Sequence, residues 1–391
     1  MKNAHKRWGL GVALLLVAGT GLAVATPMAA SAAPQSPKAC GLPTRSGHIA
    51  GIIPAMGKCQ SNSVSQIAGS TRGAHNASDP ALGTPPLIFH GGSVMMTPST
   101  SPLTVTPIFW NPTSFPMASA YKSLITSYLN DVAAASGQNT NVFSVLNEYS
   151  GTNGQISYSV KVGTSINDTD ALPKSGCTVA RTDKRRIYAD GSGYSACLDD
   201  AQLQAEINSI TAASGLPHNL SNIYVLYLPQ HVESCFNPGS TATAANECTI
   251  NFQPSAAFCA YHSEAASSAV YANMPYPIYQ SATGFTCGSD GSFGVVESPN
   301  GNPDADVVIS PTSHEISEAI TDPDTMTGWF DSSGFEIGDE CNFVYGATQG
   351  TAGQLFNQVI NGQHFLTQEE FSNKDFALTA GGCVQAAADE A

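Results

Sequence analysis

The segment Ser310–Pro323, which reads Ser-Pro-Thr-Ser-His-Glu-Ile-Ser-Glu-Ala-Ile-Thr-Asp-Pro, holds the residues best suited to chemistry. His314 and Glu318 are four residues apart, so on a helix they project from one face, as the two ligands of H-E-x-x-H zinc peptidases do. The second ligand position here holds Glu, whose oxygen binds Zn²⁺ at nearly the distance of an imidazole nitrogen. The segment therefore predicts an H-E-x-x-E metal site in which Glu315 is the general base toward a metal-activated water.

Signals at both ends of this segment support a helix. Ser310 can cap it, and Pro311 suits the first helical position, where no N–H is needed. Pro323 ends it, which places Asp322 at or beyond the last turn, with a carboxylate that could turn back toward Glu318. An ordinary capped helix without metal is the alternative, because H-E-x-x-E is less specific than the full zinc signature.

A second acidic segment, Phe335–Cys341, offers the third ligand that zinc sites commonly take from a separate downstream stretch. Glu336 and Asp339 are the candidates. Asp339 is favoured because it follows Gly338, which permits a sharp turn, and precedes Cys341, where a disulfide could fix the loop. A solvated acidic turn is one alternative.

Calcium is the alternative to zinc. Hard oxygen donors that suit calcium are numerous here, although their spacing does not match an EF-hand loop. These donors are Asp322, Asp324, Asp331, Glu336 and Asp339.

The first 32 residues read as a secretory signal peptide, with Lys2, Lys6 and Arg7 at the start, an apolar run, and an Ala30-Ser31-Ala32 cleavage pattern. No later stretch approaches the roughly 18 apolar residues of a membrane span, so we expect a secreted, extracellular protein with no membrane association after signal removal. Removal takes away three basic and no acidic residues, so the net charge changes from −15 to −18. This charge argues against nucleic acid as a partner.

All ten cysteines lie beyond the signal peptide, and none forms a C-x-x-C pair, which favours disulfides over thiolate zinc sites. Nearest-neighbour pairing closes loops of modest length. It predicts Cys40–Cys59, Cys177–Cys197, Cys235–Cys248, Cys259–Cys287 and Cys341–Cys383.

Composition divides the remaining chain in two. Residues 33–102 are rich in Ser, Pro, Gly and Ala and read as a flexible leader or pro-segment, whereas residues 103–388 are long enough for one large domain. In this domain, strand-like and helix-like patterns alternate and predict an α/β (α+β) fold. Strands are expected at 103–110, 156–162 and 223–228, and helices at 118–135 and 199–213.

Two further strands, 258–263 and 270–276, are expected near the site, and Ala305–Ile309 leads straight into the helix cap. A substrate could pair with a sheet edge there. We leave His262 out of the site, because a lone His beside aromatic residues is more often a structural residue.

Several of these segments together resemble the bacterial branch of the EXORDIUM, or phosphate-induced protein, family over roughly residues 103–385. The resemblance implies a secreted protein with a zincin-like domain, in which a mixed sheet and an active-site helix are stapled by disulfides. The family name does not by itself imply catalysis. The segments are 105–110, 258–262, 313–323, 336–341, 356–362 and 368–373.

The favoured interpretation is a secreted zinc peptidase that acts on a polypeptide substrate. His314, Glu318 and Asp339 or Glu336 hold the metal, and Glu315 takes a proton from its water. The alternative is a non-catalytic extracellular protein with structural Ca²⁺ or a vestigial metal site. A serine hydrolase is disfavoured because no G-x-S-x-G occurs in the sequence. The oligomeric state is not predicted.

Overall fold

The computed structural model describes residues 78–174, 176–177, 190–236, 248–249, 258–280 and 286–391, together with the backbone of strand β1 (Ile49–Ala50). All of these belong to one unit, Ala39–Ala391. The predicted signal peptide, most of the predicted leader and the Cys40–Cys59 pair lie outside the described residues.

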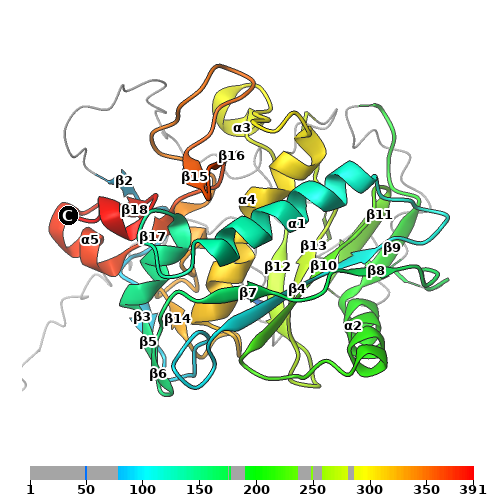
Figure 1. The fold of residues 1–391 in the computed structure, drawn as a ribbon, viewed down its shortest axis with the longest axis horizontal. Coiled ribbons are helices and arrows are strands. Elements are labelled where there is room, and N and C mark those ends of the chain that lie inside the picture. Colours follow the sequence, from blue (N-terminus) through cyan, green and yellow to red (C-terminus); the bar gives the residue numbers. More distant parts are fainter. Residues whose placement is uncertain are drawn as a thin grey trace, which may run out of the picture. The chain divides into compact units, whose positions relative to one another are not determined.

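A mixed sheet forms the centre of the unit, in the order β1-β12-β13-β10-β4-β7, with β8 also paired to β4 (Figure 1). Strand β4 pairs in parallel with β7, β8 and β10, and β10 pairs in parallel with β13. Strand β12 pairs antiparallel with both β13 and β1. The chain is therefore α/β with a mixed sheet, as the sequence predicted. The strands are β4 (Leu103–Trp110), β7 (Val160–Val162), β8 (Ile166–Asp168), β10 (Asn222–Tyr227), β12 (Tyr261–Glu264) and β13 (Val270–Met274).

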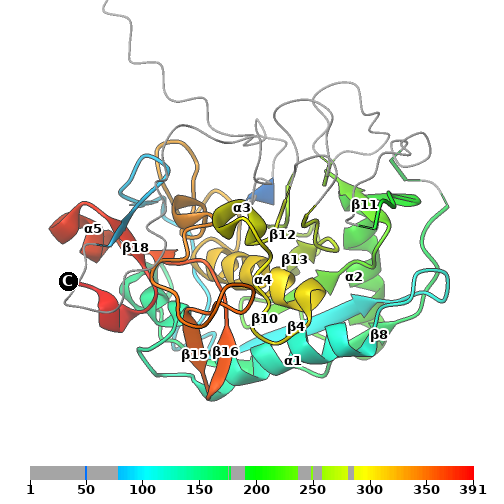
Figure 2. The ribbon, with the colours of Figure 1, turned by 90° about the horizontal axis from the view of Figure 1, so that it is seen from above.

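Helices cover both faces of this sheet, which is why β4 and β10 are buried almost throughout. Alternate side chains of β10 enter two separate clusters: Val225 joins the cluster of α1 (Ser119–Ala134) and α4 (Pro303–Thr321), and Leu226 joins that of α2 (Asp200–Ser214). Residues of α1 and α4 share one core cluster on one face of the strands, and Figure 2 shows α1 running alongside β4.

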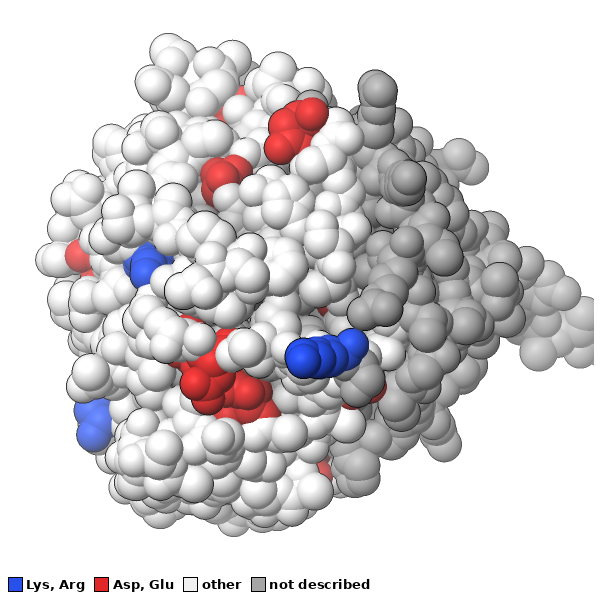
Figure 3. Space-filling model, turned by 90° about the vertical axis from the view of Figure 1, so that its right-hand side faces the viewer, with Lys and Arg blue, Asp and Glu red and all other residues white. Residues whose placement is uncertain are grey.

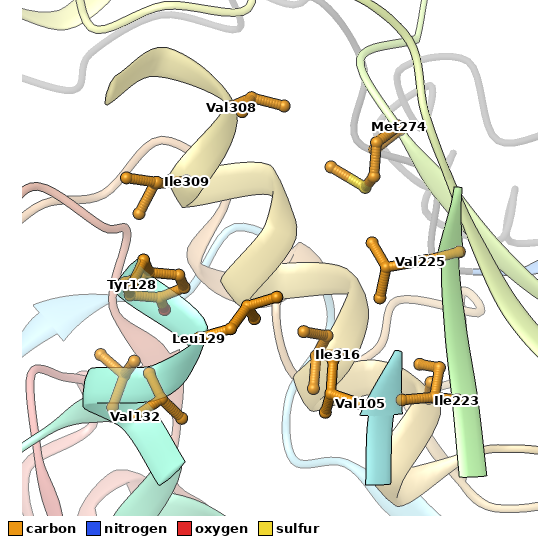
Figure 4. Packing of buried hydrophobic residues seen from close by; sticks show 14 of the residues in the cluster. Val105, Tyr128, Leu129, Val132, Ile223, Val225, Met274, Val308, Ile309 and Ile316 are labelled. Carbon is orange, nitrogen blue, oxygen red and sulfur yellow. The ribbon is translucent and has the colours of Figure 1, made fainter. Parts of the chain in front are cut away.

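Helix α4 packs between α1 and the sheet. In Figure 4, Ile316 of α4 lies between Leu129 of α1 and the strand residue Ile223, while Ile309 lies on the side of α4 that faces Tyr128 of α1. All of these side chains are buried, so α4 is fixed by apolar contacts on two sides. The position of its polar face is thereby fixed as well.

The start of α4 differs from the prediction. The helix begins at Pro303, so Ala305–Ile309 belongs to the helix instead of preceding its cap, and Pro311 lies inside the helix rather than at its first position. Pro303 supplies the proline start signal, and Asp306 accepts bonds from the N–H groups of Asn300 and Asn302. The run Val-Val-Ile resembles a strand by propensity, but its packing against the core favours the helix. The end at Thr321, before Pro323, agrees with the prediction.

The remaining predicted elements are confirmed with small shifts in their bounds, except that β7 covers only the end of the predicted 156–162 strand. The other elements surround the sheet. They are β2 (Asp79–Pro80), β3 (Ile88–Phe89), η1 (Val142–Glu148), β5 (Ser150–Gly151), β6 (Gly154–Gln155), β9 (Ala196–Asp199), β11 (Val232–Cys235), α3 (Asp290–Phe293), β14 (Trp329–Phe330), η3 (Asp339–Cys341), β15 (Gln358–Ile360), β16 (Gln363–Phe365), β17 (Glu370–Phe371), α5 (Asn373–Thr379), β18 (Gly382–Val384) and η4 (Ala387–Asp389).

Four of the five predicted disulfides are present: Cys177–Cys197, Cys235–Cys248, Cys259–Cys287 and Cys341–Cys383. They are compatible with an extracellular, oxidising location. Within the described part of the chain, no helix has both the length and the apolar character to cross a membrane. On the face shown in Figure 3, described Asp and Glu side chains gather in groups while the described Lys side chains are isolated.

Residues 78–102, assigned to the leader from composition, are packed into the fold. Strand β2 pairs with β18 and β3 pairs with β14, and the side chains of Val94, Met95 and Met96 are fully buried. The packed structure therefore extends N-terminal of residue 103. Ser, Pro and Gly are frequent in this segment because it forms turns over the C-terminal loops rather than long strands.

Two truncations test this boundary. A chain that starts at Ser78 should fold, whereas one that starts at Leu103 should not, because each fully buried apolar side chain contributes about 1.5–3 kcal/mol and whole domains have only about 5–15 kcal/mol of stability. Both are produced in an oxidising compartment and compared by circular dichroism and thermal unfolding. Equal unfolding midpoints for the two chains would contradict the boundary.

Candidate functional site

The second half of α4 brings the predicted ligands together. His314 Nε2 lies 2.9 Å from Glu318 Oε1 and 3.7 Å from Asp339 Oδ1. Two ligands of a tetrahedral zinc lie about 3.4 Å apart, given metal–ligand bonds of roughly 2.1 Å. Despite this proximity, neither ring nitrogen of His314 has a hydrogen-bond partner. The three groups therefore converge on a common point, as ligands of one ion do.

A second group adjoins the first and contains a residue that sequence reasoning left out. His262 of β12 places Nδ1 3.4 Å from Glu315 Oε2 and 3.6 Å from Glu318 Oε2, and its Nε2 lies 3.8 Å from Glu336 Oε1. Ligand atoms of His262, Glu318 and Glu336 lie within 4.8 Å of one another, as do those of the first group. Glu318 belongs to both groups. We call His262, His314, Glu315, Glu318, Glu336 and Asp339 the His–carboxylate cluster.

The His–carboxylate cluster is closed to solvent, with every member at 0 % or 1 % exposure. No described lysine is buried, and no arginine lies in the described part of the chain. Burying carboxylates without a compensating cation is costly. Burial accordingly raises the pKa of Glu315, Glu336 and Asp339 well above their ordinary values, and the nearby Glu318 carboxylate raises each further.

The two imidazoles lower the pKa of Glu318. Burial opposes its ionisation, but His314 and His262 outweigh burial and lower the pKa of Glu318 to about 2. In turn, burial opposes protonation of His314, yet Glu318 and Asp339 raise the pKa of His314 above its ordinary value. Glu318 is therefore the carboxylate that carries the negative charge of the cluster.

The acidic loop is held against α4 by several contacts. The Asp339 N–H donates to Glu318 Oε1 at 3.0 Å, and the Cys341–Cys383 disulfide ties the loop to β18. Gln368 Nε2 donates to the carbonyl of Gly338 at 2.8 Å, and that glycine lies directly against the His314 ring. The predicted anchoring of this loop at Cys341 thus agrees with its structure.

Asp322 has a structural role instead of joining the cluster. Its carboxylate accepts hydrogen bonds from the N–H groups of Met326, Thr327 and Gly328 at 2.6–3.0 Å, so it closes the turn after α4. Asp331 likewise accepts from the N–H groups of Ser333 and Phe335. The five carboxylates considered as calcium ligands therefore do not converge on one point in the described structure.

Sequence reasoning missed two cluster neighbours. His262 was set aside because it stands alone in an aromatic strand, and only the pairing of β12 with β13 brings it over α4. Glu370 of β17 is fully buried, has no hydrogen-bond partner for either oxygen, and has a pKa raised by burial and then by Glu318. One signal in the sequence could have pointed to His262. The predicted site contains several acidic residues and only one histidine, so a second cationic side chain is expected near it.

A surface depression of about 480 Å³ lies elsewhere, lined by residues of α1 and by Phe109, Ser165 and Asn167. No member of the His–carboxylate cluster lines it. It therefore gives no access to the cluster.

The fold and site define an α/β protein with a buried His–carboxylate cluster on the helix that packs under its mixed sheet. A scan of protein-family models and searches of curated proteins and of solved structures gave no match to this chain.

Gly338 lies so close to the His314 ring that there is no room for a side chain. A Cβ on Gly338 would lie 2.6 Å from His314 Nδ1, closer than real contacts allow, although φ of −81° suits any residue. Gly338→Ala should therefore displace the His314 ring and lower the unfolding midpoint, and it should do so much less in a His314→Ala background, where the clash is absent. Thermal unfolding of the two single variants and the double variant measures this. Additive losses would show that Gly338 acts elsewhere.

A separate carboxylate group lies at the far side of the sheet, where Asp168, Asp170 and Glu206 approach one another. Burial, followed by the charge of Asp168, raises the pKa of Glu206 from 4.5 to about 7. Because the folded state keeps a proton that the unfolded chain loses, the stabilisation is full below about pH 4.5 and is lost as the pH rises through about 7.

Glu206→Gln should flatten this pH dependence. The full pKa shift corresponds to roughly 3 kcal/mol, but solvent screening at this half-exposed position reduces the effect to about 1 kcal/mol. In EDTA, the unfolding midpoint of the wild type should therefore fall more between pH 5 and pH 8 than that of Glu206→Gln. Parallel curves for the two proteins would rule out Glu206 as the source.

Proposed function

We propose that this protein is a secreted metal-dependent hydrolase, a zinc peptidase with a zincin-like arrangement of sheet and active-site helix. The observation that carries the proposal is the convergence of two carboxylates on one imidazole: Glu318 Oε1 lies 2.9 Å and Asp339 Oδ1 lies 3.7 Å from His314 Nε2. Glu315 lies on α4 together with His314 and Glu318.

The donor set fits a zinc ion. One imidazole and two carboxylates are accepted zinc ligands, and both nitrogens of His314 are buried without hydrogen-bond partners. A cation would also compensate the buried negative charge. When bound, zinc supplies Lewis acidity and allows water to act as a nucleophile near neutral pH.

Glu315 is placed to handle the proton. Its Oε1 is buried without a partner, and its Oε2 faces His262 Nδ1 at 3.4 Å. Burial and then Glu318 raise the pKa of Glu315, which gives this carboxylate the proton affinity a general base needs. In the proposed reaction, Glu315 accepts a proton from water as the water oxygen bonds to the scissile carbonyl carbon, and it passes that proton to the amine as the C–N bond breaks.

The polypeptide substrate is proposed from the sheet edge. Strand β1 pairs antiparallel with β12, with Ala50 opposite His262 and Ile49 opposite Ser263. The edge beside the cluster thus accepts an extended backbone, which is how a peptide substrate binds by strand addition. Because β1 belongs to the predicted leader, the precursor would hold its own chain where a substrate lies.

Complete burial of the cluster favours a second candidate, a non-catalytic extracellular protein like the EXORDIUM family whose metal is structural. A metal closed off from solvent stabilises the fold without meeting a substrate. The two candidates differ in whether a chain that lacks residues 1–77, and hence β1, cleaves protein substrates.

Glu315→Gln separates base from ligand. It should keep the metal and the fold but lose hydrolysis by about 10²-fold or more, because a neutral amide cannot take the proton. His314→Ala should instead lose the metal. Cleavage of an unfolded protein substrate and zinc content by mass spectrometry measure both, in the chain that starts at Ser78. Wild-type cleavage rates in Glu315→Gln would exclude Glu315 as the base, and bound zinc without any cleavage would favour the structural candidate.

The third ligand is tested by Asp339→Asn and Glu336→Gln in parallel. The larger rise in the zinc dissociation constant should come from Asp339→Asn, because Asp339 faces His314 while Glu336 faces His262. Zinc titration with a competing chelator measures the constants. A larger loss for Glu336→Gln would exchange the two assignments.

A further inference from the structure

We propose that the His–carboxylate cluster holds two divalent cations bridged by Glu318. The first ion is that of the proposed function, bound by His314, Glu318 and Asp339, and the second is bound by His262, Glu318 and Glu336. The inference rests on the proposed function only in that the two ions share Glu318.

The two halves have the same composition. Each contains one imidazole and one terminal carboxylate, and each uses a different oxygen of Glu318. Oε1 lies 2.9 Å from His314 Nε2, and Oε2 lies 3.6 Å from His262 Nδ1. A carboxylate that directs its two oxygens to two separate ligand sets is arranged as a bridge, and co-catalytic metal pairs are commonly about 3.5–4 Å apart.

Unpartnered atoms point to a ligand in the second half. Both oxygens of Glu336 and Oε2 of Glu318 are fully buried without hydrogen-bond partners. Buried polar atoms are nearly always satisfied in folded proteins, so an unsatisfied set that converges within 4.8 Å requires an explanation. A cation satisfies all of them at once.

The surroundings of His262 support the same conclusion. Its Nε2 lies 3.3 Å from the backbone carbonyl oxygen of Asp322, which can only accept a hydrogen bond. In the neutral ring with the hydrogen on Nε2, the lone pair of Nδ1 faces Oε2 of Glu315 and Oε2 of Glu318, while Glu336 Oε1 lies 3.8 Å from Nε2. An imidazole whose other nitrogen donates to a carbonyl is the usual state of a metal ligand.

A bridged pair also accounts for the buried charge better than one ion does. Glu315, Glu318, Glu336, Asp339 and Glu370 are all buried with no described lysine or arginine among them. One divalent ion would leave most of these carboxylates uncompensated or protonated, whereas two ions supply four positive charges. The second ion lies beside Glu315, where it would stabilise negative charge that develops on a substrate.

Zinc stoichiometry tests the proposal. The chain that starts at Ser78 and the longer chain that starts at Ala33 are saturated with Zn²⁺, passed over a desalting column and analysed for zinc per folded chain. The wild type should hold two equivalents, and His262→Ala and Glu336→Gln should each hold one. Glu318→Gln should lower the affinity for both ions. Glu369→Gln is the matched control. Glu369 is a buried carboxylate next to Glu370 in the chain, but it faces Asp79 and Asp375 rather than the cluster.

Each outcome decides between one ion and two. One equivalent that is lost in His314→Ala but kept in Glu336→Gln would overturn the second site and leave the proposed function intact. One equivalent lost in both His262→Ala and His314→Ala would mean that both imidazoles hold a single ion, which also overturns the pair. No zinc in any folded form would overturn the pair together with the proposed function.

Manganese provides a readout that is independent of activity and of counting. Two Mn²⁺ ions that share a carboxylate couple magnetically, so the six-line resonance of isolated Mn²⁺ should weaken as the second equivalent is added to the wild type. Glu336→Gln, an isosteric change that preserves the loop, should retain the isolated signal at one equivalent. A six-line signal that grows steadily through two equivalents in the wild type would contradict a bridged pair.

Discussion

The structure depends on one electrostatic constraint: helix α4 is buried, and one of its buried faces carries the carboxylates of Glu315 and Glu318. Apolar residues of this helix pack against α1 on one side and the sheet on the other, so its position is fixed by dispersion and hydrophobic contact. Glu315 and Glu318 are thereby carried into a site with 0 % exposure. Isolated charges at such a site are very costly, so the surrounding elements must supply donors, imidazoles or a cation.

The surrounding elements meet this requirement from three directions. The antiparallel strand β12 brings His262 over the helix, and the loop ending at η3 brings Glu336 and Asp339 from the other side. The Cys341–Cys383 disulfide and the hydrogen bond from Gln368 hold this loop where its own like charges oppose it. Strands β2 and β3 pack on the same C-terminal loops, so the segment from Ser78 onward also supports the site.

Local sequence signals predicted what depends on local rules. The i, i+4 spacing of His314 and Glu318, the long apolar strands and four disulfides of adjacent cysteines could all be found from the chain. The helix start could not, because tertiary packing overrode the strand propensity of Val307, Val308 and Ile309. His262 could not either. Its partners are more than 50 residues away in the chain, and sheet topology alone brings them together.

The exchange of the second histidine of the zinc motif for Glu318 has a physical consequence beyond added charge. An imidazole offers one nitrogen to one ion, because its other nitrogen points away across the ring. A carboxylate offers two oxygens about 2.2 Å apart that can face different neighbours. His314 lies on one side of Glu318 and His262 on the other, so in the proposed ion pair a carboxylate at this position would join two ligand sets that a histidine would keep separate. The departure from the zinc signature is therefore consistent with the rest of the cluster, since a second imidazole and a second terminal carboxylate are present where a bridging residue needs them.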